Sequence, residues 1–283
     1  MSPKFGVVVD STCDLPTDWP YHDRVHVIPE HIRFDDRDYR EGVDITPAEF
    51  FQKVLEQGSI PKTSQPSPGE FAELYSQLAD RYDAIFSLHL GAKLSGTYQS
   101  AVLGAQMVAD KITVYPVDSN NGSAGVGFMA DEVIELIDAG ATPEAILQRM
   151  KTLRERIQIF LTPRDLTFPR LSGRISALSA FIASVLHIVP VIILTDGELV
   201  ASERARSRKK AIIKMVQMMS ERLGDGPVNI ALIHSQAPED VAPFKDAVLA
   251  AFHPQKFWIA GLSSSVSAHL GPGTIGIVGY RTD

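Results

Sequence analysis

Cysteine is almost absent from this sequence: Cys13 is the single one among 283 residues. An intrachain disulfide and a cysteine-based zinc site are both excluded, and a reducing cytoplasm suits such a chain. Cys13 stands in the segment STCD, where a small semi-buried residue is more typical than a nucleophile. His22, His26 and His31 are spaced too irregularly for a metal site. We therefore expect no metal and no other cofactor.

Long hydrophobic runs are also scarce. The N-terminal run FGVVV is too short for the core of a signal peptide and ends at Asp10, so we expect a cytoplasmic protein. The uncharged segment from Ile175 to Thr195 approaches the length of a membrane span. Serines dilute its first half, and Pro190 separates a helical pattern from a β-branched one. We expect a buried helix over 177–187, a buried strand over 189–194, and no stable membrane insertion.

Positive charge is sparse and scattered. The formal net charge is -7, which argues against broad electrostatic binding to nucleic acid or anionic lipid. The exception is ERARSRKK, residues 203–210, which enters a predicted helix at the end where the helix dipole disfavours cations. Two interpretations stay open: a solvated helix start, and a surface for an acidic protein or a phosphate-bearing ligand.

Several catalytic signatures are missing. No Gly-x-Ser-x-Gly elbow of a serine hydrolase is present. The segment GAKLSGT, residues 91–97, is not a phosphate loop, because Lys93 precedes Ser95 and Gly96 instead of following the second glycine. Gly125 and Gly127 follow a predicted strand, as in dinucleotide-binding proteins, but no acidic residue marks the end of the next strand. Close helix packing explains these glycines better, and nucleotide binding is kept as a third hypothesis.

Short apolar, β-branched runs alternate with helical patterns along the first half of the chain. The runs are FGVVVD, AIFSLHL, ITVYPVD and QIFLT. This alternation is typical of an α/β protein with parallel strands. After QIFLT the composition shifts to proline, arginine and glycine before further strands and helices follow. We predict two domains: residues 1–160 as an N-terminal α/β/α layer with a mainly parallel sheet, and residues 161–283 as a mixed sheet with helices.

Hydroxyl and amide side chains dominate the loops that follow the predicted strands. Ligands of open α/β sheets bind outside the carboxyl ends of the strands. The loops in question contain Asp10–Thr12, Lys62–Gln65, Ser95–Thr97 and Ser119–Asn121, and later His234, Ser235 and His269. The first amides of a helix lack internal partners and favour an anion, and Gly96 would let that anion approach closely. Ser95 therefore either caps a helix or helps to bind one carboxylate or phosphate.

Seven segments, taken in order, resemble the DegV family. They are VVVDSTCDLP, KTSQPSPGEF, LSGTYQSA, VDSNNGSAGVG, GRIS, DGEL and AHLGPG, and together they cover nearly the whole chain. The resemblance implies a two-domain α/β protein that holds one long-chain fatty acid between its domains. It further implies that the protein presents this acid to a separate fatty acid kinase and has no catalytic activity of its own.

The resemblance also implies roles for particular residues. The carboxylate would be held by Thr63, Ser95, the Gly96 amide and His269. The nearest counterparts of the basic residues that face the kinase are Arg174 and Arg204. The sequence departs from the family pattern at His89 and Gly91, where serines are usual, and in FPRLSGRIS, residues 168–176. The alternative hypothesis is a serine-dependent hydrolase or acyltransferase that uses Ser95 and a histidine on acyl substrates.

Overall fold

The structure is a computed structural model that describes residues 3–176, 178, 181 and 188–283. The chain divides into two compact units, of which the first comprises Met1–Cys13 and Asp18–Glu155. The second comprises Asp14–Thr17 and Arg156–Asp283. The mixed α/β class that the sequence predicts is confirmed, with a parallel sheet in the first unit and a mixed sheet in the second. The domain boundary near residue 160 stays a prediction.

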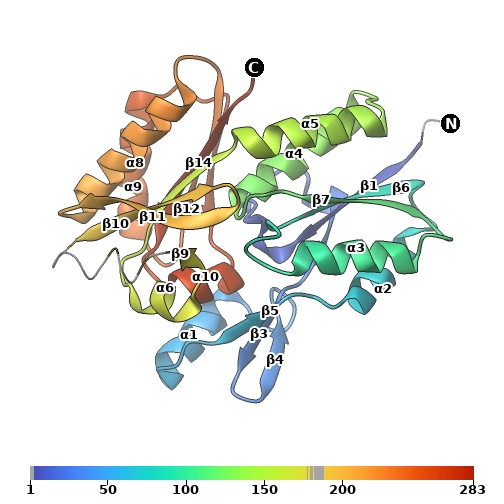
Figure 1. The fold of residues 1–283 in the computed structure, drawn as a ribbon, viewed down its shortest axis with the longest axis horizontal. Coiled ribbons are helices and arrows are strands. Elements are labelled where there is room, and N and C mark those ends of the chain that lie inside the picture. Colours follow the sequence, from blue (N-terminus) through green and yellow to red (C-terminus); the bar gives the residue numbers. More distant parts are fainter. Residues whose placement is uncertain (1–2, 177, 179–180, 182–187) are drawn as a thin grey trace. The chain divides into compact units, whose positions relative to one another are not determined.

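A four-stranded, fully parallel sheet forms the centre of the first unit. Its strand order is β2-β1-β6-β7, with β1 Phe5–Asp10, β2 Val25–Ile28, β6 Ala84–His89 and β7 Thr113–Asp118. Figure 1 shows α2 (Pro68–Leu78) and α3 (Thr97–Met107) over one face, and α4 (Ala124–Asp138) and α5 (Pro143–Arg156) over the other. All six residues of β6 are buried, because helices cover both faces of the sheet.

The first unit also contains a small antiparallel sheet that the sequence analysis did not anticipate. Its order is β4-β3-β5, with β3 His31–Phe34, β4 Arg37–Arg40 and β5 Lys62–Ser64. Helix α1 (Pro47–Gln57) packs Phe50 against Phe34 of β3, with the ring centroids 5.8 Å apart. Two short 3-10 helices, η1 (Ser11–Cys13) and η2 (His22–Arg24), complete the unit. The strands of three or four residues are too short for their side-chain alternation to be recognised.

Helices α1 and α2 both begin at capping boxes. Thr46 and Ser67 each form a complete capping box with the glutamate three residues later, Glu49 and Glu70 respectively. Each box is followed by a proline at the beginning of the helix. The local sequence therefore determines where α1 and α2 begin.

A seven-stranded mixed sheet forms the second unit. Its order is β13-β12-β14-β8-β10-β11-β9, with β8 Gln158–Thr162, β9 Ile175–Ser176, β10 Val189–Thr195, β11 Glu198–Ala205, β12 Val228–His234, β13 Lys256–Gly261 and β14 Ile275–Arg281. The expectation that QIFLT continues the parallel run is wrong, because β8 pairs antiparallel with both β10 and β14. Asp196 and Gly197 form the turn between β10 and β11, with φ of 50° and 77°.

Four helices of the second unit have described bounds. They are α6 Thr167–Ser172, α8 Arg208–Leu223, α9 Pro238–Ala251 and α10 Ser264–Leu270. One face of α8 packs Met215 and Met219 into a core that includes Ile230 and Ile277 of the sheet. The strand expected over 189–194 is confirmed by β10, whereas the helix expected over 177–187 lies almost entirely outside the described residues. Within the described part of the chain, no helix is long and apolar enough to cross a bilayer.

Helices α2 and α3 approach each other closely at Gly104. A Cβ at this position would lie 2.5 Å from Phe71 Cβ and 2.9 Å from the Pro68 carbonyl oxygen. Neither atom belongs to the flexible end of a side chain. The packing of α3 therefore requires glycine here, although glycine disfavours a helix interior.

We predict that Gly104→Ala destabilises the protein by about 1 to 3 kcal/mol, because overpacking outweighs the gain in helix propensity. Gly69→Ala in α2 is the matched control, since a Cβ there would meet only Ser67 Oγ at 3.8 Å. Urea unfolding of the two variants measures the difference. Equal or higher stability for Gly104→Ala than for Gly69→Ala would contradict this account of the packing.

Candidate functional site

Polar residues gather at the carboxyl edge of the parallel sheet in the first unit. Strands β1, β2 and β6 run in the same direction, so their carboxyl ends share one edge. Asp10 ends β1, His89 ends β6, and Glu30 follows β2 by two residues. All three are buried, at 0%, 0% and 4% exposure. The edge thus combines two buried acids and a buried imidazole with the loops that the sequence analysis singled out.

The N-terminus of α3 lies at this edge. Gly96 is the N-cap residue with φ of -76°, and no side chain caps the helix from that position. Ser95 stands one residue earlier, where its Oγ accepts a hydrogen bond of 3.3 Å from the Thr97 amide and lies 2.8 Å from Thr97 Oγ1. Ser95 therefore supports the first turn weakly, and its half-buried hydroxyl stands beside the amides that favour an anion.

The loop that contains Thr63 reaches the same place. Thr63 pairs with Ile32 in the small sheet, and Gln65 follows two residues later. A Cβ on Gly96 would lie 2.9 Å from Gln65 Nε2, so the two loops are in contact. The structure therefore brings the segments of Thr63, Ser95 and Gly96 together within the first unit.

The fourth predicted residue, His269, lies on α10 in the second unit. Strands β12 and β13 are parallel and end at His234 and Gly261, and Ser235 Oγ lies 2.9 Å from Ser267 Oγ of α10. Burial, together with the charge of Arg174, lowers the pKa of His269 to about 4. His269 is therefore neutral at pH 7 in the free protein, and its ring can donate one hydrogen bond.

Three buried polar atoms near the carboxyl ends of β12 and β13 lack hydrogen-bond partners among the described residues. They are His234 Nδ1, Ser263 Oγ and Ser264 Oγ. An unpaired buried donor or acceptor costs about 1 to 3 kcal/mol. A polar group of a ligand would accordingly be stabilised at this edge.

A fully buried hydrogen-bonded network has the connectivity of a catalytic triad. Ser87 Oγ lies 2.6 Å from His89 Nε2, and His89 Nδ1 lies 3.2 Å from Asp10 Oδ2. The Ser87 hydroxyl is also 2.8 Å from Tyr75 OH, and all four residues are 0% exposed. No substrate can reach the Ser87 oxygen in this arrangement. The network therefore stabilises the sheet edge. Ser87 is not an accessible nucleophile for the hydrolase hypothesis.

The two buried acids have opposite titration behaviour. Burial opposes ionisation of Asp10, but hydrogen bonds from His89, Thr12 and the Leu90 amide outweigh it and lower its pKa. Burial raises the pKa of Glu30 well above its ordinary value, and the negative charges of Asp10 and Glu41 add to this effect. The hydrogen bond from Thr97 opposes the rise only partly. Asp10 thus keeps its charge, whereas Glu30 favours the protonated form.

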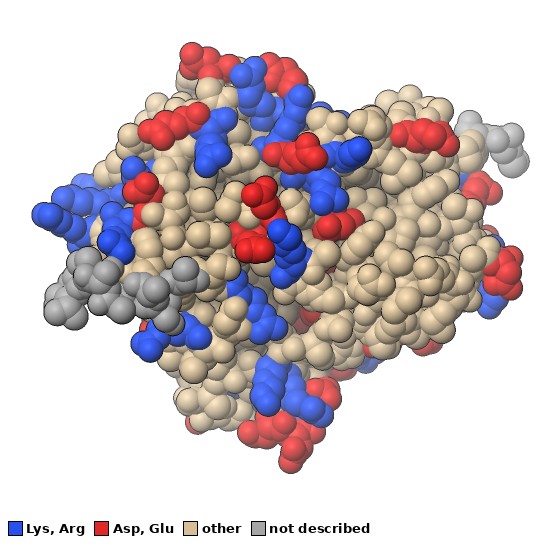
Figure 2. All heavy atoms as spheres, in the orientation of Figure 1, with Lys and Arg blue, Asp and Glu red and all other residues tan. Residues whose placement is uncertain are grey.

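The predicted docking residues Arg174 and Arg204 are both exposed in the second unit. The Arg204 guanidinium lies 4.4 Å from the centroid of the Phe181 ring. Arg208, from the same basic run, is compensated by Asp240 and by the carbonyl oxygens of Thr162 and Gly273. The basic run thus combines one half-buried structural arginine, Arg208, with exposed cations. Figure 2 shows acidic and basic side chains interspersed over the drawn face.

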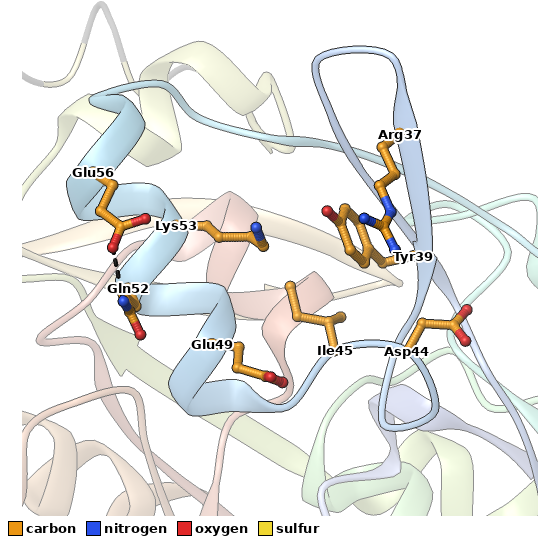
Figure 3. Close-up of a pocket in the computed structure, with 8 residues that line it drawn as sticks. All are labelled: Arg37, Tyr39, Asp44, Ile45, Glu49, Gln52, Lys53 and Glu56. Carbon is orange, nitrogen blue, oxygen red and sulfur yellow. Dashed lines mark hydrogen bonds between the residues drawn. The ribbon is translucent and has the colours of Figure 1, made fainter.

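A separate pocket of about 360 Å³ lies between β4 and α1 (Figure 3). The Arg37 guanidinium and the Lys53 ammonium both face the ring of Tyr39, at 4.8 and 5.5 Å from its centroid. Glu49 and Glu56 add negative charge to its lining. The pocket contains none of the predicted site residues. Its cation–π contact between Lys53 of α1 and Tyr39 of β4 links the helix to the small sheet.

A model of the DegV family, described as "Uncharacterised protein, DegV family", matches residues 4–282. The chain belongs to the DegV family. It is 33% identical to Protein DegV of Bacillus subtilis over 97% of this chain and 98% of the relative. Two solved structures of this family are similar to the chain over nearly their whole length.

The first is a DegV family protein of Thermus thermophilus titled for fatty acid binding, with 35% identity and a TM-score of 0.91 over 98% of this chain and 99% of the other. The second is DegV of Bacillus subtilis, titled a fatty acid binding protein, with 32% identity and a TM-score of 0.89 over 99% and 100%.

The sequence pointed to Thr97 as a loop residue of the site, but it did not point to Glu30 and Glu41. Glu30 stands in the short segment IPEH, which matches no motif used above, and Glu41 follows a four-residue strand. Their proximity arises only when β2, β3 and α3 are assembled. Asp10 and Ser95 could be recognised as candidates, because each lies at or after the end of an apolar run that the sequence shows clearly.

The raised pKa of Glu30 predicts a pH-dependent stability. Above about 4.5, the ordinary value, the folded protein holds a proton that the unfolded chain releases, so the free energy of unfolding falls as pH rises. Glu30→Gln removes this effect. The stability of the variant relative to the parent should therefore increase with pH, by at most about 1.4 kcal/mol per pH unit.

Urea unfolding of ligand-free protein from pH 5 to 9 measures this difference. Glu73→Gln, at an exposed position on α2, is the control and should differ from the parent by a constant amount. A constant difference for Glu30→Gln as well would show that Glu30 has no raised pKa.

Proposed function

We propose that this protein binds one long-chain fatty acid and presents it to a separate fatty acid kinase, without catalysing a reaction itself. The relatives titled as fatty acid binding proteins, at 35% and 32% identity over nearly the whole chain, support the ligand class. In this proposal Thr63, Ser95, the Gly96 amide and His269 hold the carboxylate. The observation that carries it is the meeting of the Gln65 loop with Gly96 beside the Ser95 hydroxyl.

The chemistry of these groups suits a single carboxylate. Hydroxyls, backbone amides and a neutral imidazole are donors without a fixed positive charge, and the helix dipole of α3 adds a favourable field. The pKa of His269, lowered to about 4, keeps this histidine neutral before the ligand arrives.

The contacts of the carboxylate head group determine how tightly the fatty acid binds. Burying roughly 15 methylenes at about 0.8 kcal/mol each contributes on the order of 12 kcal/mol. Association costs about 4 to 15 kcal/mol, so the chain alone gives little net affinity. Hydrogen bonds to the charged head group, at about 1.5 to 3 kcal/mol each, must therefore make the complex tight.

Mass spectrometry of an organic extract of the purified, denatured protein tests the ligand class. A long-chain acid in a one-to-one ratio with the protein supports the proposal. The rival acyltransferase hypothesis instead predicts a covalent acyl-enzyme after incubation with an activated ester. Intact-mass measurement after that incubation distinguishes the two.

We predict that the double variant Thr63→Ala, Ser95→Ala binds palmitate roughly 100-fold more weakly than the parent, because two hydrogen bonds to the carboxylate are lost. Lys93→Ala, two residues from Ser95 and exposed, is the matched control and should bind within about twofold of the parent. Titration calorimetry with ligand-free protein measures both. Equal affinities for the double variant and the parent would exclude this head-group site.

Presentation to a kinase requires that the carboxylate be reachable by a second protein. We propose that Arg174 and Arg204, both exposed, contribute to the docking surface. Exposed arginines at a rim act mainly through steering and orientation of an acidic partner.

We predict that Arg204→Glu lowers kcat/KM of an ATP-dependent bacterial fatty acid kinase at least tenfold, because charge reversal opposes encounter with an acidic surface. Palmitate binding should stay within about twofold of the parent. Arg222→Glu, at another exposed arginine of the second unit, is the control. Unchanged phosphorylation with Arg204→Glu would remove this residue from the docking surface.

A further inference from the structure

A chain of hydrogen bonds leads from the buried carboxyl of Glu30 to the hydroxyl of Ser95. Thr97 Oγ1 lies 2.6 Å from Glu30 Oε1, and Ser95 Oγ lies 2.8 Å from Thr97 Oγ1. Thr97 is 0% exposed and Glu30 is 4% exposed, so water does not compete for the inner bond. Ser95 is half-buried and forms the outer end of the chain.

The number of protons on these groups limits what Ser95 can do. A threonine or serine hydroxyl carries one proton that it can donate. When Glu30 is ionised, Thr97 donates its proton to the carboxylate, so Ser95 must donate its own to Thr97 Oγ1. Ser95 Oγ also accepts from the Thr97 amide at 3.3 Å. An ionised Glu30 therefore leaves Ser95 without a proton for an external anion.

Protonation of Glu30 reverses the direction of donation along these hydrogen bonds. The acid then donates to Thr97 Oγ1, and Thr97 donates to Ser95 Oγ. The Ser95 proton becomes available to a group outside. An external carboxylate at Ser95 also repels an ionised Glu30, because both carry negative charge.

We propose that Glu30 is a positioning residue whose protonation turns the Ser95 hydroxyl outward, so that the protein takes up one proton at Glu30 when a carboxylate binds at Ser95. This inference rests on the proposed function. The charged groups that face Glu30 are Asp10 from β1 and Glu41 after β4, both buried acids. Their charges raise the pKa of Glu30 further, which favours uptake of the proton there.

Titration calorimetry of palmitate binding to ligand-free protein measures the proton directly. Runs at each pH from 6 to 9.5, in two buffers of different ionisation enthalpy, give the number of protons taken up per palmitate. For the parent, this number should rise with pH from near zero to close to one. Its affinity should fall up to tenfold per pH unit over the same range. For Glu30→Gln, the uptake should be near zero and the affinity should change less than twofold per pH unit.

Thr97 supplies a second pair of variants that leaves the acid in place. Thr97→Val removes the connecting hydroxyl with little change of shape and should lose the uptake, whereas Thr97→Ser keeps the hydroxyl and should retain it. His269→Gln should retain it as well. Circular dichroism and melting temperature establish that each variant is folded.

The inference would be overturned if Glu30→Gln or Thr97→Val took up as many protons per palmitate as the parent. It would also be overturned if only His269→Gln lost the proton uptake. Palmitate binding by the parent with no uptake at any pH would overturn the inference and leave the proposed function intact. Failure of the parent to bind palmitate would overturn both.

Discussion

The buried carboxylate of Asp10 is the constraint on which the first unit's candidate site depends. It ends β1 and accepts hydrogen bonds from the Thr12 amide and hydroxyl, from the Leu90 amide and from the His89 ring. These bonds connect the loop after β1 to the loop after β6, and the second of these leads to Ser95 and α3. A charged group with 0% exposure is tolerated because so many donors surround it. The position of the α3 N-terminus thus follows from the satisfaction of one buried charge.

The asymmetry between Asp10 and Glu30 follows from the same physics. Both are buried acids at the same sheet edge, and two negative charges at short range do not both ionise readily. Asp10 is surrounded by donors, whereas the described hydrogen bond to the Glu30 carboxyl comes from Thr97 alone. A proton is therefore held more readily by Glu30 than by Asp10. A pair of acids held in opposite states is the arrangement by which proteins assign distinct roles to like groups.

Local chemistry explains why so many elements could be predicted from the sequence. Thr46 and Ser67 begin their helices through capping boxes that depend on residues within one turn. The Asp196-Gly197 turn depends on the ability of those two residues to adopt positive φ. By contrast, QIFLT was assigned to the wrong run of strands, because the direction in which a strand pairs depends on distant partners such as β10 and β14. The short strands β3, β4 and β5 carry too few residues to show a period.

The sequence by itself determined the family, the α/β class, the helix starts and the loops rich in hydroxyls, because each of these depends on residues that are close along the chain. Only the tertiary structure decided which groups from separate loops touch. The contact of Gln65 with Gly96 and the hydrogen bond of Thr97 to Glu30 join residues far apart in sequence. Such contacts depend on strand order and helix packing, and no spacing between two residues encodes them. The burial that raises the pKa of Glu30, and the hydrogen bonds that lower the pKa of Asp10, are properties of the assembled unit for the same reason.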